Sequence, residues 1–177
     1  NSIGKNVLVS RKASIYSVSN ISLGNHVRID DFSVLSGGKE ITIGDYVHIA
    51  CFCGLYGGSG IVIGSHSTLS SRVALYSESD DFSGDSLTNP TIPIQFKPGY
   101  ISGQINIYDH VIIGTNSTIL PGVSVEDGAI VGAHSLVKDN CERWTINVGV
   151  PAKRVKARGK HLLKLMKDFE NQPISTE

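Results

Sequence analysis

Aliphatic side chains return at every sixth position within blocks of eighteen to twenty residues, and this spacing constrains the fold more than any other feature. Eighteen positions follow the rule, all of them isoleucine, leucine or valine: Ile3, Val9, Ile15, Leu23, Ile29, Leu35, Ile43, Ile49, Leu55, Ile63, Leu69, Leu75, Ile107, Ile113, Ile119, Val125, Val131 and Val137. The residue four places after each of them is small or a valine, with Lys39 as the single large exception. Neither the 3.6-residue period of an α-helix nor the two-residue alternation of a sandwich strand produces such a pattern. The spacing predicts short strands joined by sharp corners.

Three six-residue strands make one triangular coil, so the eighteen positions predict an all-β fold, a parallel β-helix of about six coils. Neighbouring coils would stack at the strand spacing of roughly 4.8 Å. Aliphatic side chains would then form a ladder inside the prism, and the small residues would leave room at its corners. Two extra residues precede each of Leu23, Ile43 and Ile63, which predicts a bulged corner at these junctions.

Two segments leave this rhythm. Residues 80–106 are rich in proline and glycine, and an excursion of that length in a compact fold is usually functional. Near the C-terminus four apolar residues stand at helical spacing: Leu162, Leu165, Met166 and Phe169. That spacing predicts a short amphipathic α-helix. We expect residues 1–158 to form one β-helix domain with an external loop at 80–106, and residues 159–177 to form the helix and a frayed tail.

Charge and cysteine content narrow the class of protein. Sixteen basic and sixteen acidic residues cancel, so no net field favours nucleic acid. No apolar run has the length that spans a bilayer, and we expect no membrane insertion. Three cysteines, Cys51, Cys53 and Cys141, make an odd count without the density of a disulfide scaffold. They indicate a reducing cytoplasm.

The six-residue rhythm runs through the segments ISLGNHVRID, ITIGDYVHIA, VIIGTNSTIL and AIVGAHSLV. It resembles the hexapeptide repeat of the left-handed β-helix acyltransferases, from residue 3 to about residue 156. The resemblance implies left-handed coiling, acetyl-CoA as the acyl donor, and a homotrimer with active sites between subunits. A closer resemblance, to sugar and nucleotide-sugar acetyltransferases of surface polysaccharide (O-antigen, lipopolysaccharide) pathways, is carried by IGSHSTLSSRVALYSESDD, the external loop and the ending GVPAKRVKAR.

One departure from that family bears on the acceptor. In its O-acetyltransferases a histidine seventeen residues after the isoleucine of this coil removes the hydroxyl proton, and counting from Ile63 places Asp80 there. A neutral amine demands less of a base than a hydroxyl does. We therefore expect an amino-sugar acceptor, with Asp80 accepting the proton or holding the ammonium, and its pKa raised by repulsion from Glu78 and Asp81. A sugar hydroxyl, as in galactoside and maltose O-acetyltransferases, is the alternative acceptor. The structural alternative is a solvated loop entrance in which Asp80 and Asp81 cap a turn.

His48 is the second catalytic candidate. It lies in GDYVHIACFCGLYGG, where related enzymes line the acetyl site, so the resemblance implies a base or a donor to the acetyl carbonyl. The expected substrate contacts are Glu78, Asp81, Asn89, Tyr100 and His66. The alternative to a direct role in the reaction is that outward histidines such as His48 and His66 stack as a ladder on the surface or pack at the interface of a trimer.

The resemblance also implies the coenzyme contacts. Thr115 and Ala133 each follow a glycine where the family lays pantetheine against exposed backbone. Lys138, Lys153 and Lys156 fall near the place where the family meets the nucleotide phosphates. A basic linker that leads to a surface helix is the alternative for the last two.

Two other classes of protein share the β-helix fold. The γ-class carbonic anhydrases share the fold and bind zinc with a histidine pair five residues apart, and no such pair exists in this sequence, so we expect no metal. A non-catalytic β-helix, such as an ice-binding protein, would carry an outward ladder of threonines. The outward columns here are mixed.

Overall fold

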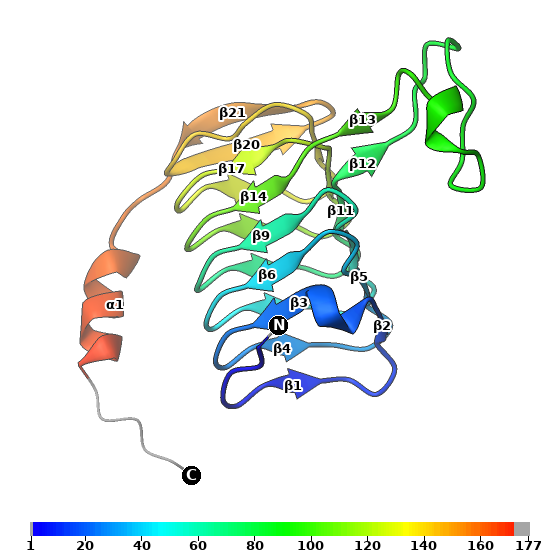
Figure 1. Cartoon of the computed structure of the whole chain (residues 1–177). Coiled ribbons are helices and arrows are strands. Elements are labelled where there is room, and N and C mark those ends of the chain that lie inside the picture. Colours follow the sequence, from blue (N-terminus) through cyan, green and yellow to red (C-terminus); the bar gives the residue numbers. More distant parts are fainter. Residues whose placement is uncertain (1, 172–177) are drawn as a thin grey trace.

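Residues 2–171, which the computed structural model describes, wind into a left-handed parallel β-helix of about seven turns (Figure 1). Through the regular coils each strand pairs in parallel with the strand one turn further along the chain, as Arg28 of β4 pairs with His48 of β7. Three sheets therefore run along the stack, one for each side of the prism. The expected fold class is confirmed.

The strands are short on all three sides. The first sheet contains β1 (Leu8–Val9), β4 (Arg28–Ile29), β7 (His48–Ile49), β10 (Thr68–Leu69), β15 (Ile112–Ile113), β18 (Ile130–Val131), β20 (Thr145–Gly149) and β21 (Ala152–Ala157). The second contains β2 (Ser14–Tyr16), β5 (Val34–Ser36), β8 (Gly54–Tyr56), β11 (Ala74–Tyr76), β16 (Thr118–Ile119) and β19 (Leu136–Val137). The third contains β3 (Ile21–Leu23), β6 (Ile41–Ile43), β9 (Ile61–Ile63), β14 (Ile105–Ile107) and β17 (Ser124–Val125). Outside these sheets lie β12 (Glu78–Ser79), β13 (Ile101–Ser102), the 3-10 turns η1 (Val18–Asn20) and η2 (Ile94–Phe96), and the helix α1 (Leu162–Glu170).

The aliphatic ladder is the core. From Leu23 onward every position of the six-residue register is buried, and each such side chain stabilises the fold by about 1.5–3 kcal/mol. The first coil differs, because Ile3 is 71% exposed and Val9 is 39% exposed. Among the described residues, no coil packs on the outer side of these two side chains.

The second inward register needs small residues because the corners are tight. Ser33 and Ser117 are fully buried there. The hydroxyl of Ser33 donates to the carbonyl oxygen of Ala50 at 3.0 Å, and that of Ser117 to the carbonyl oxygen of Gly132 at 2.9 Å. These bonds satisfy groups that would otherwise be buried without a partner. Lys39, the one large member of the register, lies exposed at a corner.

The extra residues at three junctions lie in the corner before the third side. Ile21, Ile41 and Ile61 are buried, begin strands β3, β6 and β9, and pair in register with one another. In a coil of eighteen residues the buried Val123 takes the corresponding place, so these isoleucines are not additional to the side. The predicted extra length at the corner is present, but it precedes the strand, as in the 3-10 turn η1, and does not include these isoleucines.

The stack is about one turn longer than the eighteen aliphatic positions indicate. Ile146 of β20 pairs with Ile130 of β18 and so continues the first sheet. Strand β21 then folds back against β20 in antiparallel orientation. The hairpin covers the end of the prism, where Asn147 is buried and donates to the hydroxyl of Thr145 at 2.9 Å.

One corner carries a ladder of aromatic rings. His26, Tyr46, His66 and His110 all have φ between 56° and 58°, the left-handed conformation that costs a non-glycine residue about 1–2 kcal/mol. Their rings stack at centroid distances of 4.5, 5.0 and 5.2 Å, which offsets part of that cost. Phe169 of α1 packs edge-on against Tyr46 at 5.2 Å, so the predicted helix lies along this corner.

Figure 1 shows α1 on one side of the stack and the excursion between β12 and β13 projecting on the other. Arg158 anchors the chain that leads to α1, because its guanidinium donates to the carbonyl oxygens of His110 and Gly128 at 2.7 and 2.9 Å. No helix within residues 2–171 has the length and apolar character that crossing a bilayer requires. Of the expected tail, residues 172–177 lie outside the described part of the chain.

Candidate active site

Polar contacts join the two ends of the external loop where it leaves the prism. We call this region, which contains Glu78, Asp80, Lys97 and Tyr100, the loop root. The ammonium of Lys97 lies 2.6 Å from Oδ1 of Asp80 and donates to the carbonyl oxygen of Asn89 at 3.1 Å. The backbone N–H of Asn89 in turn donates to Oδ2 of Asp80 at 2.8 Å. Two residues expected at the site, Asp80 and Asn89, thus meet through a lysine that the sequence analysis did not consider.

A second pair of expected residues, Glu78 and Tyr100, lies beside these contacts. The hydroxyl of Tyr100 donates to Oε2 of Glu78 at 2.8 Å, and Ser59 donates to Oε1 at 2.8 Å. The Lys97 ammonium lies 4.3 Å from the centroid of the Tyr100 ring. Burial, and then the hydrogen bond to Glu78, raises the pKa of Tyr100 to about 12, so its hydroxyl stays a donor near neutral pH.

A glycine lies next to the Glu78 carboxylate. A Cβ atom on Gly58 would lie 2.0 Å from Oε2 of Glu78, which is closer than any real contact. The glycine therefore opens the space that the carboxylate occupies, and this gives Gly58 a role in shaping the loop root.

The electrostatics of Asp80 differ from expectation. Its pKa lies below the ordinary value, first because of the hydrogen bond from Lys97 and then because of the backbone N–H of Asn89. The expected upward shift of the pKa was wrong, since these two hydrogen bonds outweigh the opposing effect of burial. Asp81 faces the loop itself: its carboxylate accepts from the backbone N–H of Ser83 at 2.9 Å, and that bond is the first cause of its lowered pKa.

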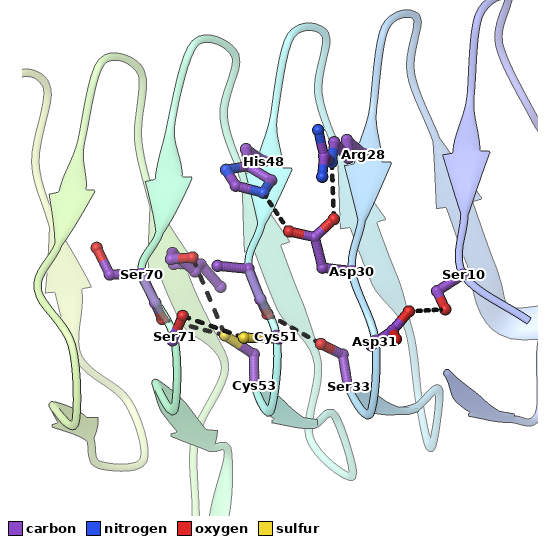
Figure 2. A network of polar contacts seen from close by, with 12 residues as sticks. Ser10, Arg28, Asp30, Asp31, Ser33, His48, Cys51, Cys53, Ser70 and Ser71 are labelled. Atoms are coloured by element: carbon purple, nitrogen blue, oxygen red, sulfur yellow. Dashed lines mark hydrogen bonds and ion pairs between the residues drawn. The ribbon is translucent and has the colours of Figure 1, made fainter. Parts of the chain in front are cut away.

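His48 forms a second polar cluster on the first sheet (Figure 2). Its Nε2 lies 2.8 Å from Oδ2 of Asp30, and Nε of Arg28 donates to Oδ1 of the same carboxylate at 2.7 Å. The His48 hydrogen bond, ahead of that from Arg28, lowers the pKa of Asp30, so an ionised carboxylate accepts the Nε2 proton. Nδ1 is then the ring nitrogen with a lone pair for a proton.

His48 and Asp80 do not meet within one protomer. His48 lies on β7 of the first sheet, whereas Asp80 follows β12, which leaves the prism beyond β11 of the second sheet. Each is set in its own network of partners. One chain therefore presents two separate polar clusters on different sides of the prism.

A largely apolar cavity of about 540 Å³ opens where the loop leaves the second sheet. Its lining consists of Tyr76, Glu78, Ser79, Phe82, Ile101, Thr118, Leu120, Pro121 and Lys138. The cavity brings Glu78, expected to contact the substrate, close to Lys138, expected to contact the coenzyme. Its size falls in the range of small-molecule sites.

His66 lies apart from the loop root. Its ring stacks between Tyr46 and His110 in the corner ladder and lines a hollow of about 340 Å³ under α1. Burial, followed by repulsion from His110, lowers its pKa. The stacked surface ladder considered for the outward histidines describes this geometry.

Thr115 and Ala133 occupy the same place in successive coils. The carbonyl oxygen of Thr115 accepts from the backbone N–H of His134 at 2.8 Å, and its hydroxyl donates to the carbonyl oxygen of Ser71 at 2.6 Å. A Cβ on Gly114 would lie 2.5 Å from the nitrogen of Ala133. Gly114 is therefore required for the close stacking of the coils, in addition to any contact with the coenzyme.

The three expected phosphate-binding lysines lie toward the hairpin end of the stack. Lys138, which precedes Asp139 in the sequence, and Lys153 of β21 approach the carboxylate of Asp139 at 4.0 and 3.2 Å. Lys156 lies on β21 opposite Ile146 and is exposed. Exposed ammonium groups of this kind can reach an anionic ligand.

Neither the thiols nor the carboxylates assemble a metal site in the described part of the chain, where no group of three or more potential ligands occurs. Cys53 and Cys141 are free thiols inside the prism, and burial raises the pKa of each to about 11. Cys51 is a free, half-buried thiol 3.3 Å from the Ser71 hydroxyl.

Sequence reasoning missed Asp30 and Lys97. Asp30 stands eighteen residues before His48, which is close to one turn of this fold, so the coil length was the signal that pointed to it. Lys97 lies inside the irregular loop, and no periodicity in the sequence relates it to Asp80.

Full-length relatives exist among known proteins, although no protein-family model matches the chain. A dTDP-4-amino-4,6-dideoxy-D-glucose acyltransferase from Escherichia coli is 45% identical over 174 residues, which cover 98% of this chain and 90% of the relative. AntD, an N-acyltransferase from Bacillus cereus, is 48% identical with a TM-score of 0.92, over 96% of this chain and 89% of AntD, in a crystal structure with dTDP-4-amino-4,6-dideoxyglucose and coenzyme A. Another AntD structure contains dTDP and 3-hydroxybutyryl-CoA. A hexapeptide-repeat acetyltransferase from Vibrio cholerae, at 22% identity and a TM-score of 0.63 over 89% of this chain and 73% of the other, shares the fold.

Proposed function

The chain belongs to the family of dTDP-4-amino-4,6-dideoxy-D-glucose acyltransferases, and from that premise we propose that it transfers an acetyl group from acetyl-CoA to the amine of a nucleotide-linked amino-deoxy sugar. The observation that carries the proposal is the 45% identity that extends over 98% of the chain. The sugar nucleotide of the relatives is the first substrate to test. The sugar hydroxyl remains the alternative acceptor.

Asp80 is the proposed binding group for the sugar amine. Near neutral pH a sugar amine carries a proton in part of the population, and an ionised carboxylate attracts that form and orients the neutral one. A lowered pKa keeps Asp80 ionised and makes it a weak base. Variants at an aspartate and at a serine ten positions before it were chosen for AntD structures, and Ser70 stands ten positions before Asp80, as Ser71 does before Asp81.

His48 is the proposed general base. The amine nitrogen attacks the thioester carbonyl carbon, the tetrahedral intermediate collapses, and the carbon–sulfur bond breaks. The amine loses one proton in the process, which Nδ1 of His48 accepts and returns to the leaving sulfur. The Asp30 carboxylate at Nε2 orients the ring and stabilises its charged form.

The other expected residues complete the proposed substrate and coenzyme sites. Glu78, Asp81, Asn89 and Tyr100 are proposed to shape the sugar pocket at the loop root, with His66 as an outlying member. For the coenzyme we propose pantetheine along Thr115 and Ala133. Its phosphates would meet Lys138, Lys153 and Lys156, whose exposed ammonium groups support this assignment.

A homotrimer is part of the proposal. His48 and Asp80 lie on different sides of the prism, so a complete site needs His48 from one protomer and Asp80 from its neighbour. Exposed aromatic residues support such an interface: Phe32 and Phe52 stack at 5.1 Å on the outer surface. A monomer by light scattering at assay concentration would rule out a shared site.

The biological setting follows the chemistry of the acceptor. We propose that the enzyme works in the cytoplasm on an activated sugar destined for a surface polysaccharide such as O-antigen. The three free cysteines are consistent with that compartment. We also propose residues 1–158 as the catalytic domain and residues 159–177 as its appendage.

Thiol release from acetyl-CoA tests the function directly. The acceptor panel contains dTDP-4-amino-4,6-dideoxyglucose, other nucleotide-linked amino sugars, and free glycosides, with 3-hydroxybutyryl-CoA as a second donor. Mass spectrometry of the product distinguishes an amide from an ester. Turnover confined to glycoside hydroxyls would contradict an amine acceptor, and a preference for the longer donor would contradict acetyl as the group transferred.

A further inference from the structure

Lys97 is buried inside a loop that is otherwise open to solvent. Only 6% of Lys97 is exposed, compared with 91% of Phe82 in the same loop. Burying an ammonium is unfavourable unless charged and hydrogen-bonding partners surround it. A buried lysine adds nothing to the solubility of the loop. The burial of Lys97 therefore indicates a specific structural or functional role.

Its contacts link the two ends and the middle of the loop. Lys97 meets Asp80 where the loop departs, the Asn89 carbonyl in the middle, and the Tyr100 ring just before the loop returns. The backbone N–H of Asn89 completes this network, because it donates to the second oxygen of Asp80. Each carboxylate oxygen therefore has one fixed partner, and the Asp80 side chain cannot rotate without breaking two of these bonds.

The charges at the loop root leave room for one more cation. The groups that face Asp80 are Lys97 and Tyr100 from the returning half of the loop and Glu78 from β12. Tyr100 is a neutral hydroxyl, and Asp81 is bound to the turn at Ser83. Within residues 2–171 the Lys97 ammonium pairs with Asp80, and no cation pairs with Glu78, whose carboxylate accepts from Tyr100 and Ser59. The Asp80 side chain is 29% exposed although its Oδ1 is buried, so a ligand can reach the carboxylate at Oδ2.

We propose that Lys97 is a positioning residue, which holds the Asp80 carboxylate in the one orientation that receives the amine of the sugar. The inference rests on the proposed function, because it needs an amine as the acceptor. Lys97 itself touches neither substrate. It acts through Asp80, whose pKa it also lowers, so that the anion persists at mildly acidic pH.

Steady-state kinetics of Lys97→Met, Lys97→Arg, Asp80→Asn and the double variant Asp80→Asn/Lys97→Met test the inference. Lys39→Met, at an exposed corner, is the matched control. For Lys97→Met we expect the KM of the amino sugar to rise at least about tenfold while the KM of acetyl-CoA is unchanged, and Lys97→Arg to restore part of the affinity. The double variant should be no worse than Asp80→Asn alone, because Lys97 acts only through that carboxylate.

A carboxyl-carbon NMR titration supplies a readout that does not depend on turnover. The Asp80 carboxyl should titrate at higher pH in Lys97→Met than in the unaltered protein, whereas Lys39→Met should leave it in place. Equal losses for both substrates, or an unmoved titration, would overturn the inference and leave Lys97 as a purely structural residue. Failure of the unaltered enzyme to acylate any amino sugar would instead reject the proposed function, and the titration would still report on Lys97.

Discussion

Nε2 of His48 lies 2.8 Å from Oδ2 of Asp30, and the two residues come from neighbouring turns of the β-helix. A histidine held in this way by a carboxylate has one tautomer and one orientation. The first prediction follows from this pairing.

His48→Ala should lower kcat by about 10²–10⁴-fold with little change in either KM, as expected for loss of a general base. Asp30→Asn should lower kcat less, because the ring remains but loses the acceptor that fixes its tautomer. Initial rates near neutral pH measure both. His26→Ala, at the outer end of the aromatic ladder, is the control and should retain activity. Full turnover by His48→Ala would remove this residue from the reaction.

Mixing two inactive variants should restore activity if sites lie between subunits. A refolded mixture of Asp80→Asn and His48→Ala chains would contain interfaces in which both residues are intact. For random assembly these make up about one quarter of the sites. Activity of the mixture, compared with each variant alone, is the measurement. Absence of any recovery, with trimers confirmed by light scattering, would place the complete site within one chain.

Gly58→Ala should disturb the loop root without unfolding the protein. The new Cβ would meet Oε2 of Glu78, the far end of a flexible side chain, which must move and release the Tyr100 hydroxyl. Loss of one such hydrogen bond costs about 1 kcal/mol. We expect a raised KM for the sugar and a small fall in Tm. Gly159→Ala, with open space around its Cβ, should change neither.

Acid should destabilise the coils through carboxylates such as Asp45. The backbone N–H of Asn25, which donates to Oδ1 at 2.6 Å, is the first cause of its lowered pKa. A carboxyl with a lower pKa in the folded state stabilises the fold above its unfolded pKa of about 4, and this stability is lost as pH falls through the folded value. Urea unfolding at pH 6 and pH 3 should show a smaller drop for Asp45→Asn than for the unaltered chain. An equal drop in both would assign the effect to other groups.

Phe169→Ala should release α1 from the corner ladder. The edge contacts to Tyr46 and His66, at 5.2 and 6.4 Å, are each worth about 0.5–1.5 kcal/mol beyond the area they bury. Hydrogen exchange of the α1 amides should speed up while the amides of the prism keep their protection. Leu165→Ala, on a more exposed side of the helix, should have a weaker effect.

The regular part of the molecule follows from the sequence because a solenoid repeats one local rule. Positions such as Ile49 and Leu69 could be placed in the core from spacing alone, since each stacks on its counterpart one turn away. The same rule mistook Ile41 for a corner residue, because the count of residues shows that a coil is longer and does not show which residues occupy the corner.

The candidate site could be predicted less fully than the core, because the six-residue spacing does not extend into the loop. Glu78 and Tyr100 were expected near the sugar, and the structure joins them, but the bond depends on how an irregular loop closes. Lys97 was missed because its position depends on burial within that loop, and burial of a lysine is not encoded in any short pattern. The sign of the Asp80 pKa shift was wrong for the same reason.

The two parts of the proposed reaction depend on different turns of the solenoid. Asp30 lies on the turn before His48, whereas Asp80 leaves the prism beyond β11, two turns further along the chain than Asp30. In a solenoid each turn is supported only by its immediate neighbours. Local opening of one turn therefore disables either the proposed base or the proposed amine-binding group, and each can fail while the other keeps its geometry.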